Sequence, residues 1–583
     1  MNLYKFFGVM AGSVLLTSAC TDFSDYNEAY TDVEVAGSNL SLMENISSDA
    51  DLSDFAELVQ RGGMTDKLKA SQFYTIWAPK NGTFDKSKYD AMDSATLVKR
   101  FLENHIARGN VQLVGDISRR VHTLNEKSYR LEGSGVYTFG DFDVQAANKP
   151  SQNGVIHVLD GALEYRPNIY EYIFDAGDAD SIQAYFKRYE HEVLDEQASV
   201  KGPIVDGMQT YLDSVVNITN TMTAMLSAKI ENEDSSYTML IPTDNAYKKA
   251  YDRISSSFNY IDEIPYTKLD FKGNSLTQTA SSMKTESAYL QDSLTRLWIV
   301  GPTIFSNTDK YNRNGFAEGD ITDNDTIHTT TSLWLSNVDE ILSHTVNTGD
   351  MNMSNGYARI VDSLAYRPWE TWNSGIAVSA RSTTYAPGAT TCTVSSDTCT
   401  VTIDGRGTYL LSYADYVPGS NAGAPQPYYY LPHVNSGAYN IYCVFVAPST
   451  KRGVAAREYK INFTLEYAKT NGKTDKKEWK NVETEFYADV DLTTFTNANG
   501  LDTICITKDE PFTFPVSYNG LFSRDLPCAP YLTVKSARAA YNKSITTGRF
   551  KGKKEYDVYD NELRIAAIIL RPVELDEYLK TKE

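Results

Sequence analysis

The sequence predicts an α+β protein with three folded parts, two that mix helices and strands and a third that is all β. Two features support the mixed parts: one phrase recurs in which an apolar strand ends at a proline, and segments of helical periodicity surround it. From about residue 369 the chain consists of short runs rich in β-branched and aromatic residues. A chain of 583 residues is also too long for one ordinary core.

The charge balance limits the classes of partner. The formal net charge is −20, and phosphate backbones and anionic lipid headgroups both attract clustered Lys and Arg. We therefore expect no nucleic-acid partner and no electrostatic docking on a membrane.

The N-terminal twenty residues have the layout of an export signal. In "MNLYKFFGVMAGSVLLTSAC", Lys5 precedes an apolar stretch that is too short to span a bilayer. The segment Leu16–Cys20 resembles a bacterial lipobox, although Thr17 stands where leucine is usual. The resemblance implies a signal peptide over 1–19, a lipid on Cys20 and a polar tether over 20–40; the alternative is an ordinary secretory signal.

The recurring phrase reads "YTIWAPKNGTF" at 74–84 and "YTMLIPTDNAY" at 237–247. Because proline cannot donate to a ladder, each strand should end there. An Asn or Asp two positions on can cap a following turn, and the closing aromatic can return to the core. The residues concerned are Pro79, Asn81 and Phe84 in the first copy and Pro242, Asp244 and Tyr247 in the second.

A second pair of matching segments makes this an internal repeat. "QNGVIHVLDGALEYRP" at 152–167 and "SNGYARIVDSLAYRP" at 354–368 align Asn153-Gly154 with Asn355-Gly356. Before the first segment of the first copy, the sequence predicts a helix that begins near 52 and stops at Gly62. Between its two segments, it predicts a second amphipathic helix over 94–111.

These residues resemble the fasciclin domain. Its first box is an apolar strand that leads into Ala-Pro-Thr-Asn-x-Ala-Phe, here "IWAPKNGTF" and "LIPTDNAY". Its second is a strand next to Asn-Gly that contains His157, and "FLENHIARG", with His105, resembles a further box. In the second copy, Trp298 and Arg359 replace these two histidines. The resemblance implies two fasciclin-like β-wedges with helices, over 41–167 and 168–368, the second with insertions around 190–235 and 255–285, and a link to cell adhesion.

The region 369–583 is expected to be a β-sandwich or jelly roll. In "PQPYYYLPHV", prolines should keep Tyr428, Tyr429 and Tyr430 extended and poor at ladder pairing. These tyrosines either contact a ligand or pack on the edge of the sandwich. A hairpin about Ser395-Ser396 could place Cys392 opposite Cys399 in a disulfide, and the other three cysteines should be small buried residues.

Motifs for catalysis are missing from the sequence. It contains no Gly-x-Ser-x-Gly, no phosphate-binding loop and no zinc spacing; "HEVLDE" at 191–196 lacks the second histidine and reads as a solvated helix face. We therefore expect no enzyme, no metal and no cofactor.

The chain resembles lipoproteins of Bacteroidota that accompany outer-membrane glycan importers. This implies a non-catalytic protein that is lipid-anchored in the outer membrane, on its cell-surface or periplasmic face. It would serve in adhesion or capture a glycan or a protein, with the sandwich as the binding part. The alternatives are a structural subunit of such an importer and a polysaccharide-acting enzyme.

Overall fold

The computed structural model describes most of the chain after residue 38. The ranges are 39–69, 72–196, 199–205, 207–213, 216–272, 275–313, 320–346, 349, 351–379, 383–385, 393–402, 408–415, 425–446, 458–484, 501–521, 526–537, 543–560 and 563–582. The predicted signal peptide, most of the tether, Cys20 and Cys392 lie outside these residues. Within them, no helix is long and apolar enough to cross a membrane.

The chain divides into two compact units, which are described separately. Unit 1 comprises Met1–Ile241, Ile304–Asn324 and Val346–Ile360, and unit 2 comprises Pro242–Thr303, Asp325–Thr345 and Val361–Glu583.

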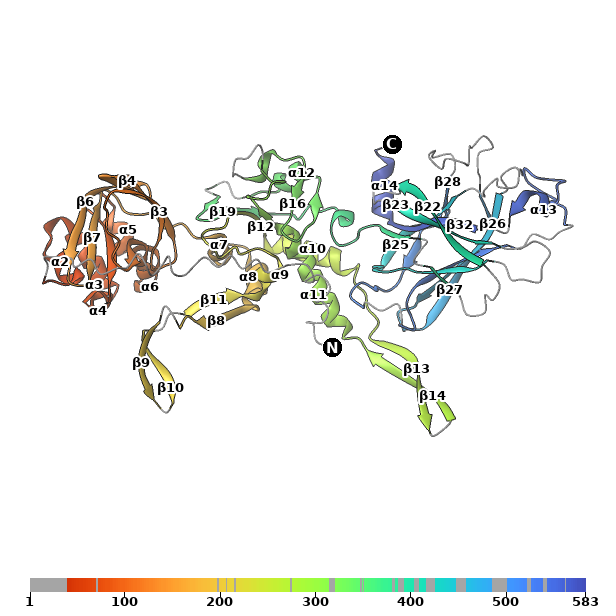
Figure 1. Ribbon diagram of the computed structural model, residues 1–583, viewed down its shortest axis with the longest axis horizontal. Coiled ribbons are helices and arrows are strands. Elements are labelled where there is room, and N and C mark those ends of the chain that lie inside the picture. The colour runs from red at the N-terminus through yellow and green to blue at the C-terminus, as the bar shows by residue number, and fades with distance from the viewer. Residues whose placement is uncertain are drawn as a thin grey trace. The chain divides into compact units, whose positions relative to one another are not determined.

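Unit 1 begins with a seven-stranded sheet of order β2-β1-β7-β6-β5-β4-β3 (Figure 1). Its strands are β1 Tyr74–Pro79, β2 Ile106–Arg108, β3 Asp116–His122, β4 Ser128–Ser134, β5 Val136–Phe139, β6 Phe142–Ser151 and β7 Gly154–Leu159. The two repeat segments of the first copy thus form neighbouring strands, because β1 pairs in parallel with β7 from Tyr74↔Gly154 to Pro79↔Leu159. As predicted, β1 ends at its proline.

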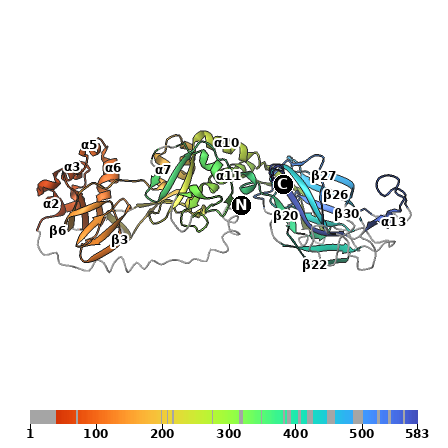
Figure 2. The same ribbon diagram turned by 90° about the horizontal axis from the view of Figure 1, so that it is seen from above.

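Helices cover one side of this sheet, as Figure 2 shows for α2, α3, α5 and α6. They are α2 Leu42–Ser48, α3 Ser53–Arg61, α4 Thr65–Lys69, α5 Lys86–Asp90 and α6 Ser94–Leu97. The predicted helix that stops at Gly62 is confirmed by α3. The helix α6 continues through the helical turns η4 Val98–Leu102 and η5 Glu103–His105. The predicted helix over 94–111 is therefore too long, because Ile106 pairs with Ile76 in the sheet. The apolar side chain of Ile106 suits a strand as well as a helix, and its pairing with Ile76 makes this residue part of a strand.

The rest of unit 1 contains a four-stranded sheet of order β15-β12-β19-β18 and three helices. The strands are β12 Tyr237–Pro242, β15 Ile304–Ser306, β18 Asn352–Met353 and β19 Gly356–Val361, and the helices are α7 Ile169–Asp175, α8 Asp180–Lys187 and α9 Thr221–Met225. The predicted insertion after α8 is an excursion of two hairpin ladders. They are β8 Glu190–Leu194 with β11 Val216–Asn220, and β9 Val200–Val205 with β10 Met208–Asp213. His191 and Glu192 therefore lie on a strand, and the predicted helix face is wrong.

Unit 2 begins with α10 Asp244–Ser255, the hairpin of β13 Glu263–Lys272 and β14 Ser275–Lys284, and α11 Ser287–Val300. The hairpin occupies the second predicted insertion. The strands β16 Ile327–His328 and β17 Trp334–Leu335, the helix α12 Val338–Ser343 and the short turn η8 Pro368–Glu370 follow.

Two mostly antiparallel sheets make up the C-terminal region. One has the order β22-β23-β32-β25-β28, with β20 on β32 and β29 on β25; the other has the order β21-β24-β30-β26-β27, with β31 on β26. The strands are β20 Ile376–Ser379, β21 Thr383–Tyr385, β22 Thr393–Thr402, β23 Thr408–Asp415, β24 Pro427–Tyr430, β25 Gly437–Val446, β26 Glu458–Ala468, β27 Thr474–Glu483, β28 Leu501–Cys505, β29 Phe512–Phe514, β30 Tyr531–Ser536, β31 Tyr559–Asp560 and β32 Leu563–Pro572. Alternate side chains of both sheets enter one core, which contains Ile441, Phe463, Val534 and Ile568.

Three local predictions for this region need correction. Ser395 and Ser396 lie within β22 and pair with β23, so they form no hairpin turn; the Cys392–Cys399 disulfide falls partly outside the described residues and stays a prediction. Prolines do not keep β24 out of a ladder, because Pro427 is its first residue, and β24 pairs on both sides. The helices α13 Glu555–Val558 and α14 Val573–Lys580 were not expected from the sequence.

Candidate functional site

The Asn-Gly pair of the first copy joins the first helix to the sheet. The Asn153 Oδ1 accepts a hydrogen bond from the Leu42 backbone N at 2.8 Å, and its Nδ2 donates to the Leu68 carbonyl at 2.9 Å. Gly154 has a φ of +150°, and an added Cβ would lie 1.9 Å from the Tyr74 carbonyl oxygen. Only glycine allows the parallel strands to approach here.

The second copy repeats this arrangement. The Asn355 Oδ1 accepts from the Ile169 backbone N at 2.9 Å, and its Nδ2 donates to the Ile230 carbonyl at 2.7 Å. A Cβ on Gly356 would lie 1.9 Å from the Tyr237 carbonyl oxygen. The matched sequence segments therefore have matched structural roles.

The two motif histidines are buried and fully hydrogen-bonded. His105 donates from Nδ1 to the Phe101 carbonyl at 2.7 Å and accepts at Nε2 from the Leu163 N at 2.9 Å. His157 donates from Nε2 to the Val111 carbonyl at 2.9 Å and accepts at Nδ1 from Asn148. Burial lowers the pKa of each imidazole to about 4, so both are neutral at pH 7. Their role is structural.

In the second copy an ion pair stands where the first has His157. The Arg359 guanidinium donates to the Asp320 carboxylate, and both side chains are largely buried. The arginine explains the burial of Asp320, since a buried charge needs a partner.

The remaining motif residues also serve the fold. The Asn81 side chain caps α3, accepting from the Asp54 N at 3.0 Å, and the predicted cap on the following turn is wrong. Phe84 packs against the first core, as expected. In unit 2, Thr243, the residue that follows Pro242, is the N-cap of α10, and Asp244 is the first residue of the helix. Tyr247 is buried.

Of the three predicted ligand-contact tyrosines, Tyr429 is fully buried in the C-terminal core, so it cannot contact a ligand. Tyr428 and Tyr430 lie on the opposite, outward side of β24. Tyr428 stacks on Tyr531 of β30, with ring centroids 4.2 Å apart and an angle of 8° between the planes. Because Tyr531 covers one face of the Tyr428 ring, only the other face could contact a ligand. Of the cysteines, Cys443 and Cys528 are buried, as expected, and Cys505 is half-buried.

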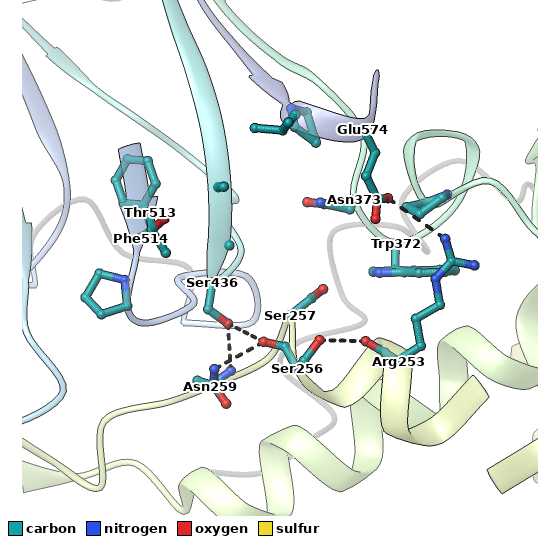
Figure 3. Close-up of a pocket in the computed structure, with 16 residues that line it drawn as sticks. Arg253, Ser256, Ser257, Asn259, Trp372, Asn373, Ser436, Thr513, Phe514 and Glu574 are labelled. Atoms are coloured by element: carbon teal, nitrogen blue, oxygen red, sulfur yellow. Dashed lines mark hydrogen bonds and ion pairs between the residues drawn. The ribbon is translucent and has the colours of Figure 1, made fainter. Parts of the chain in front are cut away.

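A pocket of about 470 Å³ in unit 2 offers a better ligand site. It lies where five segments meet: the C-terminal end of α10, η8 with the residues after it, the start of β25, the end of β29 and the junction of β32 with α14. Its lining combines aromatic, amide, hydroxyl and charged groups, among them Arg253, Asn259, Trp372, Asn373, Ser436 and Glu574 (Figure 3). The volume lies within the range usual for small-molecule sites.

Hydrogen bonds hold one wall of this pocket. The Ser436 Oγ accepts from the Asn259 N at 3.0 Å and donates to the Ser256 carbonyl at 3.1 Å (Figure 3). The Ser436 N donates to the Ser257 carbonyl at 3.1 Å, and the Asn259 carbonyl accepts from Ser517. These contacts fix the segment after α10 on the strand β25.

Buried side chains position the opposite wall. The Asn435 Nδ2 donates to the Trp372 carbonyl at 2.7 Å, and the Tyr439 hydroxyl donates to the Asn373 Oδ1 at 2.7 Å. Tyr439 is fully buried, which raises the pKa of its hydroxyl well above the usual value and keeps it a donor. These hydrogen bonds hold Trp372 and Asn373 in place, so this wall of the pocket is formed before a ligand binds.

The mouth of the pocket carries two opposite charges. The Arg253 guanidinium lies over the Trp372 ring, 5.3 Å from its centroid, and its Nη2 is 3.9 Å from the Glu574 Oε2 (Figure 3). The Arg253 and Glu574 side chains are 49% and 57% exposed, so this pair is weak and both groups can reach a ligand. Together they present donors and acceptors without net charge.

None of these pocket residues was selected from the sequence. They come from segments more than three hundred residues apart, and the only local signal is the aromatic pair of "PWETWN" at 368–373. Sequence reasoning chose Tyr428–Tyr430 because three adjacent tyrosines stand out, whereas this site depends on tertiary contacts.

Comparison with known proteins identifies the first repeat copy. Residues 50–165 match the family model of the fasciclin domain. This part of the chain is a fasciclin domain. Among solved structures, a FAS1 domain pair from the insect cell adhesion molecule fasciclin I is similar, at 12% identity over 55% of this chain and 98% of that one, with a TM-score of 0.20. The search of curated proteins found no match.

Proposed function

We propose that this protein is a non-catalytic, lipid-anchored protein of the bacterial outer membrane that captures a glycan. The neutral, mixed mouth formed by Arg253, Trp372 and Glu574 carries the proposal. A sugar hydroxyl donates and accepts at once, and a neutral sugar suits a site whose two charges cancel. Trp372 supports the donor, since the Arg253 guanidinium lies over its ring at 5.3 Å from the centroid.

In this proposal the fasciclin domain is scaffold, and residues 168–368 are a second, diverged fasciclin-like domain. Two similarities support this duplication. Asn153 and Asn355 make equivalent hydrogen bonds in their own copies, and Gly154 and Gly356 allow the same close approach of two strands. The fasciclin family is associated with cell adhesion, which fits a surface protein that binds an extracellular partner. The lipid on Cys20 would provide the membrane attachment.

The proposal is tested by affinity electrophoresis of the full chain in gels that contain members of a glycan panel. Glu574→Gln should weaken retardation about tenfold, because a charged acceptor at the mouth becomes a neutral amide. Glu577→Gln, an exposed position on the same helix α14, is the matched control and should change nothing. Equal retardation of both variants, or none across the panel, would contradict glycan capture at this site. Release of reducing ends would instead favour a polysaccharide-acting enzyme.

A further inference from the structure

The excursion of residues 190–220 in unit 1, here called the acidic arm, is rich in exposed apolar side chains. It contains the β8–β11 ladder and, between these two strands in the chain, the β9–β10 hairpin (Figure 1). Seven of the nineteen exposed large apolar residues in the described part of the chain belong to it: Val193, Leu194, Ile204, Val205, Met208, Val216 and Ile218. A concentration of this kind marks an interaction surface.

The most exposed of these side chains gather at the tip. Ile204 and Met208 are each 70% exposed and Val205 is 51% exposed, and Val205 pairs directly with Met208 across the hairpin. Nearer the base, Leu194 pairs with Val216, and Ile218 lies on the same face as Val216 two residues on. An isolated two-stranded hairpin is marginally stable in water, so contact with another molecule would stabilise the arm.

The base of the arm is firmly attached to the unit. Asn220 is buried and donates from Nδ2 to the Phe186 carbonyl at 2.9 Å and to the Tyr170 hydroxyl at 3.0 Å. The Tyr170 hydroxyl donates in turn to the Glu190 carboxylate at 2.5 Å, and Thr221 donates from its N to the Tyr189 carbonyl. The arm is therefore presented by a fixed root.

Charge distinguishes among the occupants of this surface. The arm carries six acidic residues and one lysine, a net charge of −5, and both Glu192 and Glu196 are exposed. An anionic membrane would repel it. A second copy of this chain, with its own net charge of −20, is also disfavoured.

We propose that the acidic arm docks into another protein, through an apolar groove rimmed by Lys and Arg. The apolar tip enters the groove, and the acidic residues face the basic rim. Apolar contacts would supply most of the affinity, and the charges would select the partner and speed its association. This interface is separate from the proposed glycan pocket, which lies in unit 2.

The first experiment is photo-crosslinking in cells that produce the full chain. A photoreactive amino acid replaces Ile204 or Met208, and a control chain carries it at Val136, an exposed apolar residue of unit 1 outside the arm. We expect one discrete protein adduct from the arm positions and none from Val136, with the crosslink mapped to an apolar groove flanked by basic residues.

The second experiment uses the captured protein in purified form. Ile204→Ser with Met208→Ser should raise its Kd at least tenfold, and Glu192→Lys with Glu196→Lys should slow association most strongly at low salt. Leu269→Ser with Leu276→Ser, in the other exposed hairpin, is the matched control and should leave the Kd unchanged. Unchanged melting temperatures establish that all variants are folded.

Several results would overturn the proposal. They are no adduct, the same adduct from Val136, an adduct with a second copy of this chain, or a Kd that the arm variants leave unchanged. Arm-dependent sedimentation with phosphatidylcholine vesicles, with or without phosphatidylglycerol, would identify a membrane instead.

Discussion

Lys127 offers a sharp test of how unit 1 is held together. Its side chain, in the turn between β3 and β4, is 3% exposed. Its Nζ lies 2.5 Å from the Glu171 Oε2 and 2.7 Å from the Glu233 Oε1, and Glu233 also accepts from Asn168. The fasciclin domain is thereby joined to the first residues of the second copy. Replacing Lys127 by methionine fills the space but leaves two carboxylates facing each other.

The expected loss is large at neutral pH. Removing one partner of a buried ion pair costs about 3–5 kcal/mol of unfolding free energy. In the wild type, burial alone would raise the pKa of Glu171, but the charge and hydrogen bond of Lys127 outweigh it and hold that pKa below 4.5. This carboxylate therefore stabilises the protein above its unfolded pKa, and the stabilisation is lost as the pH falls.

The variant should have the opposite pH dependence. Without the ammonium, burial raises the pKa of Glu171 above its unfolded value, so stability is lost as the pH rises through the raised pKa. The loss relative to wild type should thus be largest at pH 7 and smaller at pH 5.

Calorimetric unfolding of the full chain at both pH values measures this difference. Lys99→Met is the control, because the Lys99 Nζ lies 3.4 Å from the other oxygen of Glu171 but its side chain is 58% exposed. Such a pair contributes less than about 1 kcal/mol. A loss for Lys127→Met no larger than for Lys99→Met, or equal losses at pH 5 and pH 7, would refute the reasoning.

Three further predictions concern the cores. Gly154→Ala should lower the free energy of unfolding by more than about 3 kcal/mol, because the added Cβ would meet the Tyr74 carbonyl oxygen. Gly177→Ala is the control and should be near neutral, because open space surrounds that position. Equal melting temperatures of the two variants would contradict this. Tyr429→Ala should cost about 3–5 kcal/mol through the cavity it leaves, and a binding defect without loss of stability would argue against a core role. Because the pKa values of His105 and His157 are about 4, each histidine should remove about 3 kcal/mol of stability as the pH falls from above 6.5 to 4; NMR titration of either ring near pH 6.5 would disprove its burial.

Much of the first copy was predictable because its signals are local. A proline removes a ladder donor, so the end of β1 at Pro79 follows from the sequence, and Gly62 ends α3 by the same kind of local rule. The Asn-Gly repeats could be aligned without structure. Their partners could not, since Asn153 bonds to Leu42 and Leu68, far away in the chain.

The failures occur where two environments suit one residue. Ile106 fits a helix face or a strand, and pairing with β1 decided for the strand. Tyr429 looked like its neighbours in a row of tyrosines, but alternation along β24 turned it into the core while Tyr428 and Tyr430 turned outward. The register of a sheet is set by its neighbours, so a short sequence cannot state which of three tyrosines is buried.

The sequence by itself determined the repeat, the ends of its strands and the β-rich texture of the C-terminal region, because periodicity, proline and glycine act within a few residues. Tertiary structure alone decided which charges are paired and which surfaces are open. Arg253, Trp372 and Glu574 meet at one pocket, and Lys127 meets Glu171 and Glu233, only because packing brings distant segments together. Burial then sets the strength of each charge contact, and burial is a property of the folded chain.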